Sequence, residues 1–323
     1  MHVVRDPLRS SELPRGGVAA IGNFDGVHLG HRRILEAVVS AARAASRPSI
    51  AITFEPHPLA VLRPDKAPQR IQTLRQKEEA IEALGIETLL VIPFTRDFSL
   101  TEPEDFVRDF LCARLRVADL RIGSNFAFGH GKRGNLELLR KMGPECGFLA
   151  NGVEEVDYAG EPVSSTRIRN AIEAGDVVSA AAMMGREYEM DGIVSKGERV
   201  GRKIGYPTIN LAPENELHPA DGVYVTQIDI RSFGRRFDCV TNIGRRPTVY
   251  EDFATTIETY VLDFSSNVYG EKVRLFFFER LREERKFPSV MALTEQIGRD
   301  IEATRAYFAG KREAENGKRE EKG

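Results

Sequence analysis

The sequence predicts an α/β domain, with a parallel sheet and helices on both faces, followed by a small antiparallel β-barrel domain with a C-terminal helix. Three observations predict this order. Up to about residue 184, short apolar runs alternate with amphipathic segments at helical spacing, which is typical of βαβ units. After it, short alternating runs broken by Gly, Pro and Asn indicate a barrel or a sandwich. Residues 289–309 then carry apolar side chains along one side of a helix.

The expected strands of the first half share short, continuous apolar runs, as buried parallel strands do. They are residues 17–22, 48–54, 88–94, 118–123 and 146–152. The expected helices are residues 31–45, 73–84 and 102–115. Ligands bind such sheets at the carboxyl ends of the strands, where the unusual residues of this half fall.

The second half begins after two short expected helices, 166–174 and 176–184, which Gly175 and Asp176 separate as a C-cap and an N-cap. Six β-like runs follow, at residues 190–197, 206–212, 222–230, 236–244, 256–264 and 272–279. We place the domain boundary near Gly185. The predicted domains are therefore residues 1–184 and 185–310, with the charged segment 311–323 as a disordered tail.

The composition of the 323 residues is that of an ordinary globular protein, and its formal net charge of −2 gives no reason to expect a nucleic-acid or membrane partner. Three cysteines, Cys112, Cys146 and Cys239, have no metal-like spacing, which argues against a disulfide framework and for a reducing compartment. The N-terminus lacks the apolar region of a signal peptide. We therefore expect a cytoplasmic protein, and the sequence leaves open whether it forms a homo-oligomer.

The segment GNFDGVHLGH (22–31) follows the first expected strand and opens the first expected helix. Its three glycines permit a tight turn and close approach of a ligand to the backbone. His28 and His31 are one turn apart at the helix N-terminus, so both rings can face one ligand. Because that end favours anions, two imidazoles there predict a site that binds a triphosphate and stabilises charge on a leaving pyrophosphate.

This segment resembles the signature of the nucleotidyltransferase superfamily, and its GNFDG form resembles that of bacterial FAD synthetases. Three further segments match that family in the expected order: TFEPHP (53–58), IGSNFAFGHGKRGN (122–135) and SSTRIR (164–169). The resemblance implies a Rossmann-like nucleotidyltransferase domain. It also implies a reaction in which the FMN phosphate attacks the α-phosphorus of ATP in line and expels pyrophosphate, with Mg²⁺ bridging phosphates.

The resemblance implies a role for individual residues of this domain. Those acting on ATP would be Gly22, Phe24, His28, His31, Ser164, Thr166 and Arg167. Those lining the flavin and adenine clefts would be Pro56, Pro58, Asn125 and Phe128. Many relatives have aspartate where this chain has Asn125, so we assign that residue no metal. His57 and His130 remain without an assigned role.

The C-terminal half contains no GxxxxGK[ST] motif, which excludes Walker-type phosphoryl transfer. Residues 192–211, GIVSKGERVGRKIGYPTINL, instead combine a Gly-rich basic loop with an extended PTIN. Thr208 and Asn210 are two apart and point to the same side, where their oxygens can ligate a Mg²⁺ that also holds ATP. The residues of this segment predicted to bind ATP are Gly197, Gly201, Arg202, Lys203, Thr208 and Asn210.

Glu258 lies in an otherwise apolar, aromatic run, where a carboxylate is costly unless it has a task. The GxxxGRxxGYPTIN string resembles the riboflavin kinase family, as do DGVY (221–224), NIGRRPT (242–248) and TIETYVLDF (256–264). The resemblance places the family's catalytic glutamate at Glu258. There it would accept the proton of the riboflavin 5′-hydroxyl as that oxygen attacks the γ-phosphorus of ATP.

The resemblance extends over about residues 15–310. Tyr260 stands where the family often has histidine, and LREERKF (281–287) resembles its mobile flavin-side segment, in which we assign no single ligand. The prediction is a bifunctional, ATP- and Mg²⁺-dependent enzyme that converts riboflavin to FMN in the C-terminal half and FMN to FAD in the N-terminal half.

Three alternatives stay open at this point. One half could be a relic without activity, although intact HxGH and PTIN motifs and Glu258 argue against it. The chain could be a flavin or nucleotide sensor without catalysis, although no catalytic group is visibly lost. A nucleotidyltransferase of coenzyme A or NAD synthesis would share HxGH, but it leaves the C-terminal half unexplained.

Overall fold

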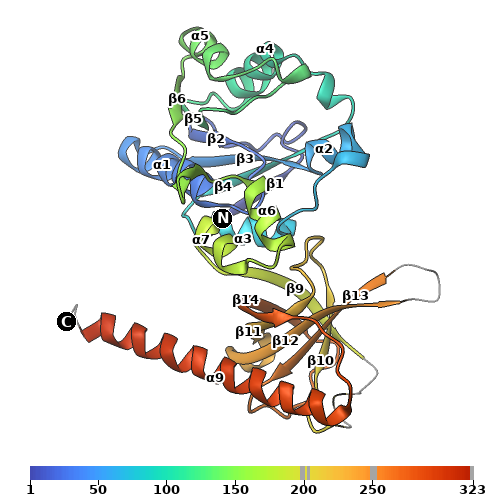
Figure 1. Ribbon diagram of the computed structural model, residues 1–323. Coiled ribbons are helices and arrows are strands. Elements are labelled where there is room, and N and C mark those ends of the chain that lie inside the picture. The colour runs from blue at the N-terminus through green and yellow to red at the C-terminus, as the bar shows by residue number, and fades with distance from the viewer. Residues whose placement is uncertain (197–200, 202–203, 248–252, 321–323) are drawn as a thin grey trace. The chain divides into compact units, whose positions relative to one another are not determined.

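The computed structural model describes residues 1–196, 201, 204–247 and 253–320. They form two compact units, Met1–Ser165 and Thr166–Gly323, each with its own sheet (Figure 1). Of the predicted ATP-binding residues, Gly197, Arg202 and Lys203 lie outside the described residues.

The first unit contains a six-stranded sheet whose neighbouring strands are all parallel (Figure 1). In sheet order the strands are β1 (His2–Arg5), β4 (Thr88–Pro93), β3 (Ser49–Glu55), β2 (Val18–Ile21), β5 (Asp119–Gly123) and β6 (Leu149–Val153). Strands β3, β4 and β1 lie on one side of β2, and β5 and β6 lie on its other side. The order therefore reverses beside β2, and a crevice for ligands is expected at its carboxyl end.

Helices cover both faces of this sheet. One face carries α1 (Leu29–Ala45) and α3 (Leu74–Glu82), and the other carries the π-helix Phe106–Arg114 and α5 (Leu136–Cys146). Strand residues alternate between the two cores: Ile21 packs with the π-helix and α5, and Ala20 packs with α1. This confirms the predicted α/β class.

Besides some of the short elements named below, the edge strand β1 and the helix α5 were not predicted. The helix has ordinary end signals, because the Asn135 side chain accepts the N–H of Leu138 at 3.0 Å and Gly147 ends the helix at a φ of 76°. Short elements complete the unit, namely α2 (Pro58–Leu62), α4 (Pro103–Asp105) and the hairpin β7 (Asp157–Tyr158) and β8 (Glu161–Pro162).

The second unit contains a closed, antiparallel six-stranded barrel, which confirms the predicted β-barrel and excludes the sandwich. Around the barrel the strands are β10 (Ile209–Pro213), β13 (Phe253–Val261), β12 (Arg235–Pro247), β11 (Gly222–Ile230), β14 (Lys272–Glu283) and β9 (Tyr188–Ser195). Pairing of β9 with β10 closes the ring. Inside, the hydroxyl groups of Thr226, Thr241 and Thr259 form a fully buried chain, with oxygens 2.7 and 2.9 Å apart.

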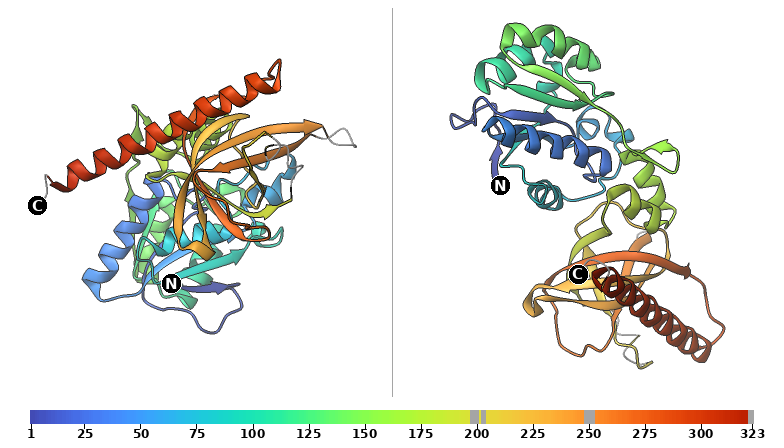
Figure 2. Two further views of the ribbon diagram at one scale, coloured as in Figure 1. Left: turned by 90° about the horizontal axis from the view of Figure 1, so that it is seen from below. Right: turned by 90° about the vertical axis from the view of Figure 1, so that its left-hand side faces the viewer.

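Helix α9 (Val290–Glu320) runs along the outside of the barrel (Figure 2). Ile301 packs on side chains of β11 and β12, and Phe308 packs on β11 and β14. Val290, an apolar residue within the predicted helix 289–309, is instead 63% exposed. The predicted C-terminal helix is therefore present, but its contact with the barrel begins beyond its first turn.

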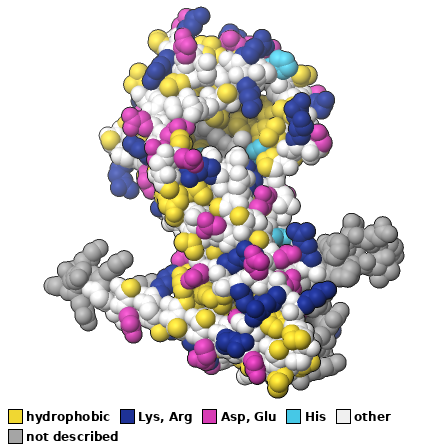
Figure 3. All heavy atoms as spheres, viewed as in Figure 1, with side chains coloured by type: hydrophobic (Ala, Val, Ile, Leu, Met, Phe, Trp, Pro, Cys, Tyr) yellow, Lys and Arg dark blue, Asp and Glu magenta, His cyan; other side chains and the backbone are white. Residues whose placement is uncertain are grey.

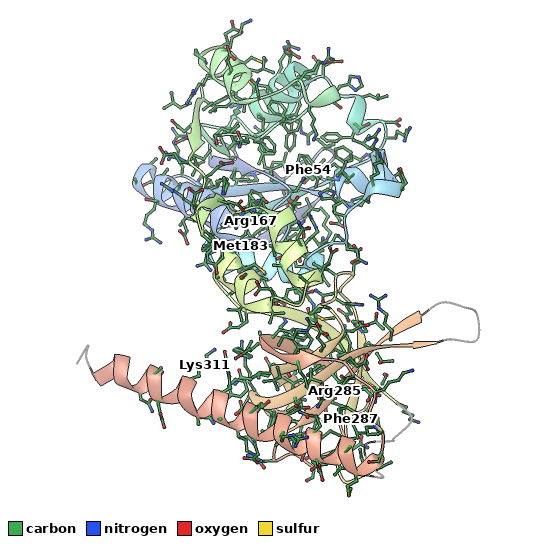
Figure 4. The ribbon with its side chains drawn as sticks, viewed as in Figure 1. Phe54, Arg167, Met183, Arg285, Phe287 and Lys311 are labelled. Carbon is green, nitrogen blue, oxygen red and sulfur yellow. The ribbon has the colours of Figure 1, made fainter. Side chains whose placement is uncertain are left out.

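Residues 311–320, predicted as a disordered tail, instead continue α9. Lys311 (labelled in Figure 4) places its Nζ 3.3 Å from a carboxylate oxygen of Glu187 and 4.1 Å from the centre of the Phe278 ring. Arg312 pairs with Asp238 at 3.0 Å. These contacts hold the start of the segment on the barrel, so the helix has a fixed base from which to continue.

The two compact units divide between Ser165 and Thr166, whereas the sequence analysis divides the chain near Gly185. Between these positions lie α6 (Ser165–Glu173) and α7 (Val177–Met184). Helix α7 packs against β9 and β14. The second unit therefore contains α7 and all of α6 except its first residue, Ser165.

Candidate active sites

The turn between β2 and α1 has a strained backbone. Phe24 and Val27 have φ angles of 48° and 36°, in the left-handed region that bulky and β-branched residues avoid, at a cost of about 1–3 kcal/mol each. Neighbouring groups hold the turn. The Asp25 carboxylate accepts the N–H of Ile71 at 3.1 Å, and the backbone oxygen of Asp25 accepts the hydroxyl of Ser165 at 2.9 Å.

His28 and His31 meet where this turn enters α1. Their rings stack with centroids 3.6 Å apart, and the Phe24 ring packs against His31 at an interplanar angle of 82°. His28 is 7% exposed and caps the helix, since its Nδ1 accepts the N–H of His31. A Cβ on Gly30 would lie 3.2 Å from the His28 ring. The glycine of HxGH therefore makes room for the first histidine.

A cavity of about 760 Å³ opens in front of this histidine pair. The first unit is hollowed there, and hydrophobic side chains lie in the hollow (Figure 3). Its aromatic lining comes from five segments and consists of Phe24, Phe54, Phe94, Phe98, Phe106, Phe126 and Phe128. Phe54 (labelled in Figure 4) lies at the end of β3 and packs edge-on against Phe94. Such a cavity suits a planar ring with a charged tail near the histidines.

Most of the predicted residues of the first unit line this cavity. They are Gly22, Phe24, His28, His31, Pro58, Asn125 and Phe128. Pro56 is exposed and is not among the lining residues. Ser164 is half-buried in the first unit, whereas Thr166 and Arg167 belong to α6 of the second.

Other cavity residues were missed by sequence reasoning. Ser165 lines the cavity, and its hydroxyl donates to the backbone oxygen of Asp25. It lies in the SSTRIR segment, but it was not among the predicted site residues. Asn125 donates to Glu155 at 2.5 Å, so this asparagine is held by a carboxylate that only the fold brings near. The sequence did not indicate that Phe94, Phe98 and Phe106 line a cavity, since phenylalanines in or beside apolar strands and helices usually belong to the core.

His57 and His130, to which the sequence analysis assigned no role, lie in different surroundings. His57 caps α2, with its Nδ1 accepting the N–H of Leu59 at 3.2 Å, and its other ring nitrogen lies 3.5 Å from the Asn23 amide. His130 is exposed on the loop that borders the cavity. Behind the strained turn, burial lowers the pKa of Lys77, and the nearby Asp25 carboxylate opposes that shift.

In the second unit, two predicted residues meet on the barrel. Asn210 of β10 lies directly opposite Glu258 of β13, and Glu258 lies opposite Asn242 of β12. Because directly paired residues share a face, two amide side chains flank the carboxylate. Thr208 precedes Asn210 by two residues, and a Cβ on Gly201 would lie 3.3 Å from its hydroxyl oxygen. Asn242 stands in the NIGRRPT segment, but only strand register assigns it to this row.

Two aromatic rings continue this face, since Tyr206 and Tyr260 pack edge to face at 5.6 Å. They contact Ile297 and Ile301 of α9. Oxygen-bearing groups and tyrosine rings thus lie side by side on the outer surface of the barrel, beside α9. Thr208, Asn210 and Glu258 supply hydroxyl, amide and carboxylate oxygens, a donor set that suits Mg²⁺.

The segment 281–287 is anchored to α9 in this structure. Arg282 forks onto Asp300 with three contacts of 2.9 to 3.2 Å, and Arg285 donates to Gln296 at 2.7 Å. The guanidinium groups of Arg282 and Arg285 lie 5.5 and 5.1 Å from the centre of the Phe287 ring (Arg285 and Phe287 are labelled in Figure 4). Two cations and one aromatic ring therefore border the Tyr260 face.

Comparison with known proteins assigns both halves. The family model described as FAD synthetase matches residues 10–167, and the one described as riboflavin kinase matches residues 184–308. A bifunctional riboflavin kinase/FMN adenylyltransferase from Escherichia coli (strain K12) is 34% identical over 310 residues, 95% of this chain and 98% of the relative. One from Pseudomonas fluorescens is 36% identical over 309 residues, 96% of this chain and 98% of the relative.

The chain belongs to the bifunctional riboflavin kinase/FMN adenylyltransferase family. Its two domains are an FAD synthetase domain that contains the cavity and a riboflavin kinase domain that contains the barrel. The kinase match begins at residue 184 and the FAD synthetase match ends at residue 167. Most of α6 and α7 therefore lies between the two matched regions.

A solved structure has the same fold over nearly the whole chain. It comes from Streptococcus pneumoniae, is described as a macrolide-efflux protein, and matches with a TM-score of 0.86 and 28% identity over 94% of this chain and 99% of the other. Within the part of this chain that the structure describes, no helix has the length and apolar character needed to cross a membrane.

The anchor of segment 281–287 can be tested in the riboflavin kinase domain. Asp300 is only 5% exposed and holds the guanidinium of Arg282. Changing Asp300→Asn should destabilise the domain by about 3 kcal/mol, because it leaves a largely buried cation with a neutral partner. Urea unfolding should show this loss, and the KM for riboflavin should rise. The exposed Glu302→Gln is the matched control on α9; an equal loss in both variants would contradict the anchor.

Proposed function

We propose that this chain phosphorylates riboflavin to FMN in the barrel unit and adenylylates FMN to FAD in the first unit, with ATP as the donor in both steps. The observation that carries the proposal is the pair of separate constellations, the stacked histidines facing an aromatic cavity and the Asn210–Glu258–Asn242 row on the barrel. The histidine pair lies within the FAD synthetase match, and the Asn210–Glu258–Asn242 row lies within the riboflavin kinase match.

For the kinase step we assign the base to Glu258. Its carboxylate would accept the proton of the riboflavin 5′-hydroxyl while that oxygen forms a bond to the γ-phosphorus and the bond to ADP breaks. Thr208 and Asn210, on the same face, would hold Mg²⁺, which neutralises charge on the ATP phosphates when bound. Gly197, Gly201, Arg202 and Lys203 stay predicted ATP-binding residues on the strength of the resemblance.

For the adenylyl transfer we assign charge stabilisation to His28 and His31. An oxygen of the FMN phosphate would bond to the α-phosphorus of ATP as pyrophosphate leaves, and the imidazoles would donate hydrogen bonds to the phosphate oxygens. Ser164, Thr166 and Arg167 would hold phosphates, and Gly22 would let ATP approach the backbone. Pro58, Asn125 and Phe128 would border the flavin and adenine, together with Pro56 as first predicted.

The test is a chromatographic time course of riboflavin, FMN and FAD with the purified protein, ATP and Mg²⁺. FMN should rise first and then convert to FAD. FMN without FAD would mean that the first site is inactive, and FAD only from added FMN would mean an inactive kinase. Binding of flavin without turnover would instead favour a sensor. Omitting Mg²⁺ in a parallel run should stop both steps.

A further inference from the structure

Two polar residues that line the cavity, Asn125 and Glu155, contact each other although 30 positions separate them in the chain. Asn125 lies in a turn that is closed by a 3.0 Å hydrogen bond from the N–H of Phe126 to the oxygen of Gly123, and asparagine is common in such turns. Its amide Nδ2 donates to Oε1 of Glu155, and the charge of the acceptor strengthens this bond. The turn therefore holds a carboxylate at the edge of the cavity.

The hydrogen bond to Asn125 leaves acceptor positions on the Glu155 carboxylate, since an ionised carboxylate has about four of them on its two oxygens. The adjacent Glu154 also lines the cavity, but it pairs with Arg33 of α1 at 3.6 Å. Asn125 is neutral, so Glu155 keeps its full negative charge. Many relatives have aspartate at position 125, which would put two carboxylates in contact here. The asparagine of this chain therefore fits Glu155.

The order of the strands separates this carboxylate from the aromatic part of the cavity. Asn125 and Glu155 follow β5 and β6, on one side of β2. On the other side, Phe54 lies in β3 and Phe94 follows β4. The turn with the histidine pair follows β2, between the two sides. A flavin ring suits the phenylalanine side, and the phosphates suit the histidines, away from a carboxylate that would repel them. The Glu155 side is left for the base of the nucleotide.

Adenine has a donor that this carboxylate can bind. Its 6-amino group presents N–H donors, and an ionised carboxylate only accepts hydrogen bonds. We propose that Glu155 accepts a hydrogen bond from the 6-amino group of ATP and so selects adenine for the adenylyl transfer, with Asn125 positioning the carboxylate. This inference rests on the proposed adenylyl transfer and adds to it the residue that recognises the base.

The first test compares two nucleotides that differ only in the 6-amino group, ATP and purine riboside 5′-triphosphate. FMN is the flavin, so the rate of dinucleotide formation reports the first unit alone. Both side chains are exposed and water competes for them, so we expect the unmodified protein to prefer ATP by about tenfold in kcat/KM. Glu155→Ala should lose this preference through a higher KM for ATP, with kcat retained.

The matched control is Glu145→Gln, which changes an exposed glutamate of α5 in the same unit. It should keep the preference for ATP. A preference that survives in Glu155→Ala, or that is missing from the unmodified protein, would overturn the proposal.

An exchange of the two groups tests the positioning role of Asn125. Asn125→Asp should lower the preference for ATP, because two adjacent carboxylates repel and move apart. Adding Glu155→Gln to that variant restores one amide and one carboxylate at this edge, with their positions exchanged, and should recover most of the preference. If the double variant were no better than Asn125→Asp, Asn125 would not position the carboxylate.

The side-chain amide of Asn125 can report binding without turnover. We would label the protein with ¹⁵N, assign this amide signal by its loss in Asn125→Asp, and add Mg–ATP, the purine riboside analogue or FMN in separate titrations. The signal should shift at lower concentrations of ATP than of the analogue, and at equal concentrations of the two in Glu155→Ala. A shift with FMN alone would assign the carboxylate to the flavin ring, and no shift with ATP would likewise overturn the proposal. Because no product is needed, this outcome is distinguishable from a failure to form FAD.

Discussion

Changing Glu258→Gln should abolish the formation of FMN from riboflavin and leave the formation of FAD from supplied FMN unchanged. Glutamine keeps the size of the side chain between Asn210 and Asn242, but it cannot accept the proton of the attacking hydroxyl. Loss of a general base lowers a rate by about 10²–10⁴-fold. The measurement is the initial rate of each step, with riboflavin or FMN as the starting flavin.

The control for this prediction is Glu302→Gln, an exposed glutamate on α9 that undergoes the same chemical change. It should leave both rates at the level of the unmodified protein. If riboflavin turnover in Glu258→Gln persisted within a few-fold of normal, Glu258 would not be the base. A parallel loss of FAD formation from FMN would point to unfolding rather than to catalysis.

Changing His28 and His31 together to Ala should stop FAD formation and let FMN accumulate. The two rings stack at the N-terminus of α1 and face the cavity, so both donors to the phosphates disappear. One oriented donor to developing charge is worth about 10²–10³-fold in rate, and the double change should exceed either single one. The measurement is the flavin composition after a fixed time with riboflavin, ATP and Mg²⁺.

The control for the histidine pair is His2→Ala, an exposed histidine in the edge strand β1. FAD output should stay normal in that variant. Continued FAD output from the double variant would remove the histidine pair from the mechanism. Loss of FMN formation as well would show that the change reaches beyond the first unit.

Much of the fold could be predicted because local sequence patterns decide it. Parallel strands buried on both faces read as continuous apolar runs, and β2, β3, β4 and β5 follow the expected ranges within two residues. The charged tail shows the limit of composition. Residues 311–320 contain few apolar groups, but Lys311 and Arg312 find partners at Glu187 and Asp238, which are far away in the chain. No local pattern reports such distant pairs.

In the candidate sites too, local motifs predicted some residues, and only the fold reveals the others. Recognisable motifs gave the histidine pair and Glu258, since the residue types and their spacing are local. The companions of these residues depend on the fold. Asn242 joins Glu258 only through strand register, and Ser165 reaches the carbonyl of Asp25 across 140 residues. Packing geometry of this kind lies outside what spacing along one chain can indicate.

The strained turn before α1 has a consequence for protein engineering. Val27 adopts a φ of 36°, which glycine adopts more readily than valine. Val27→Gly should nevertheless lower the heat resistance of the protein, because Val27 is 1% exposed in the core beside α1 and loss of its side chain would leave a cavity. Core packing therefore keeps the strained φ in place, and with it the position of His28, which follows Val27 in the chain. A selection that scores heat resistance and FAD yield together should keep valine at position 27.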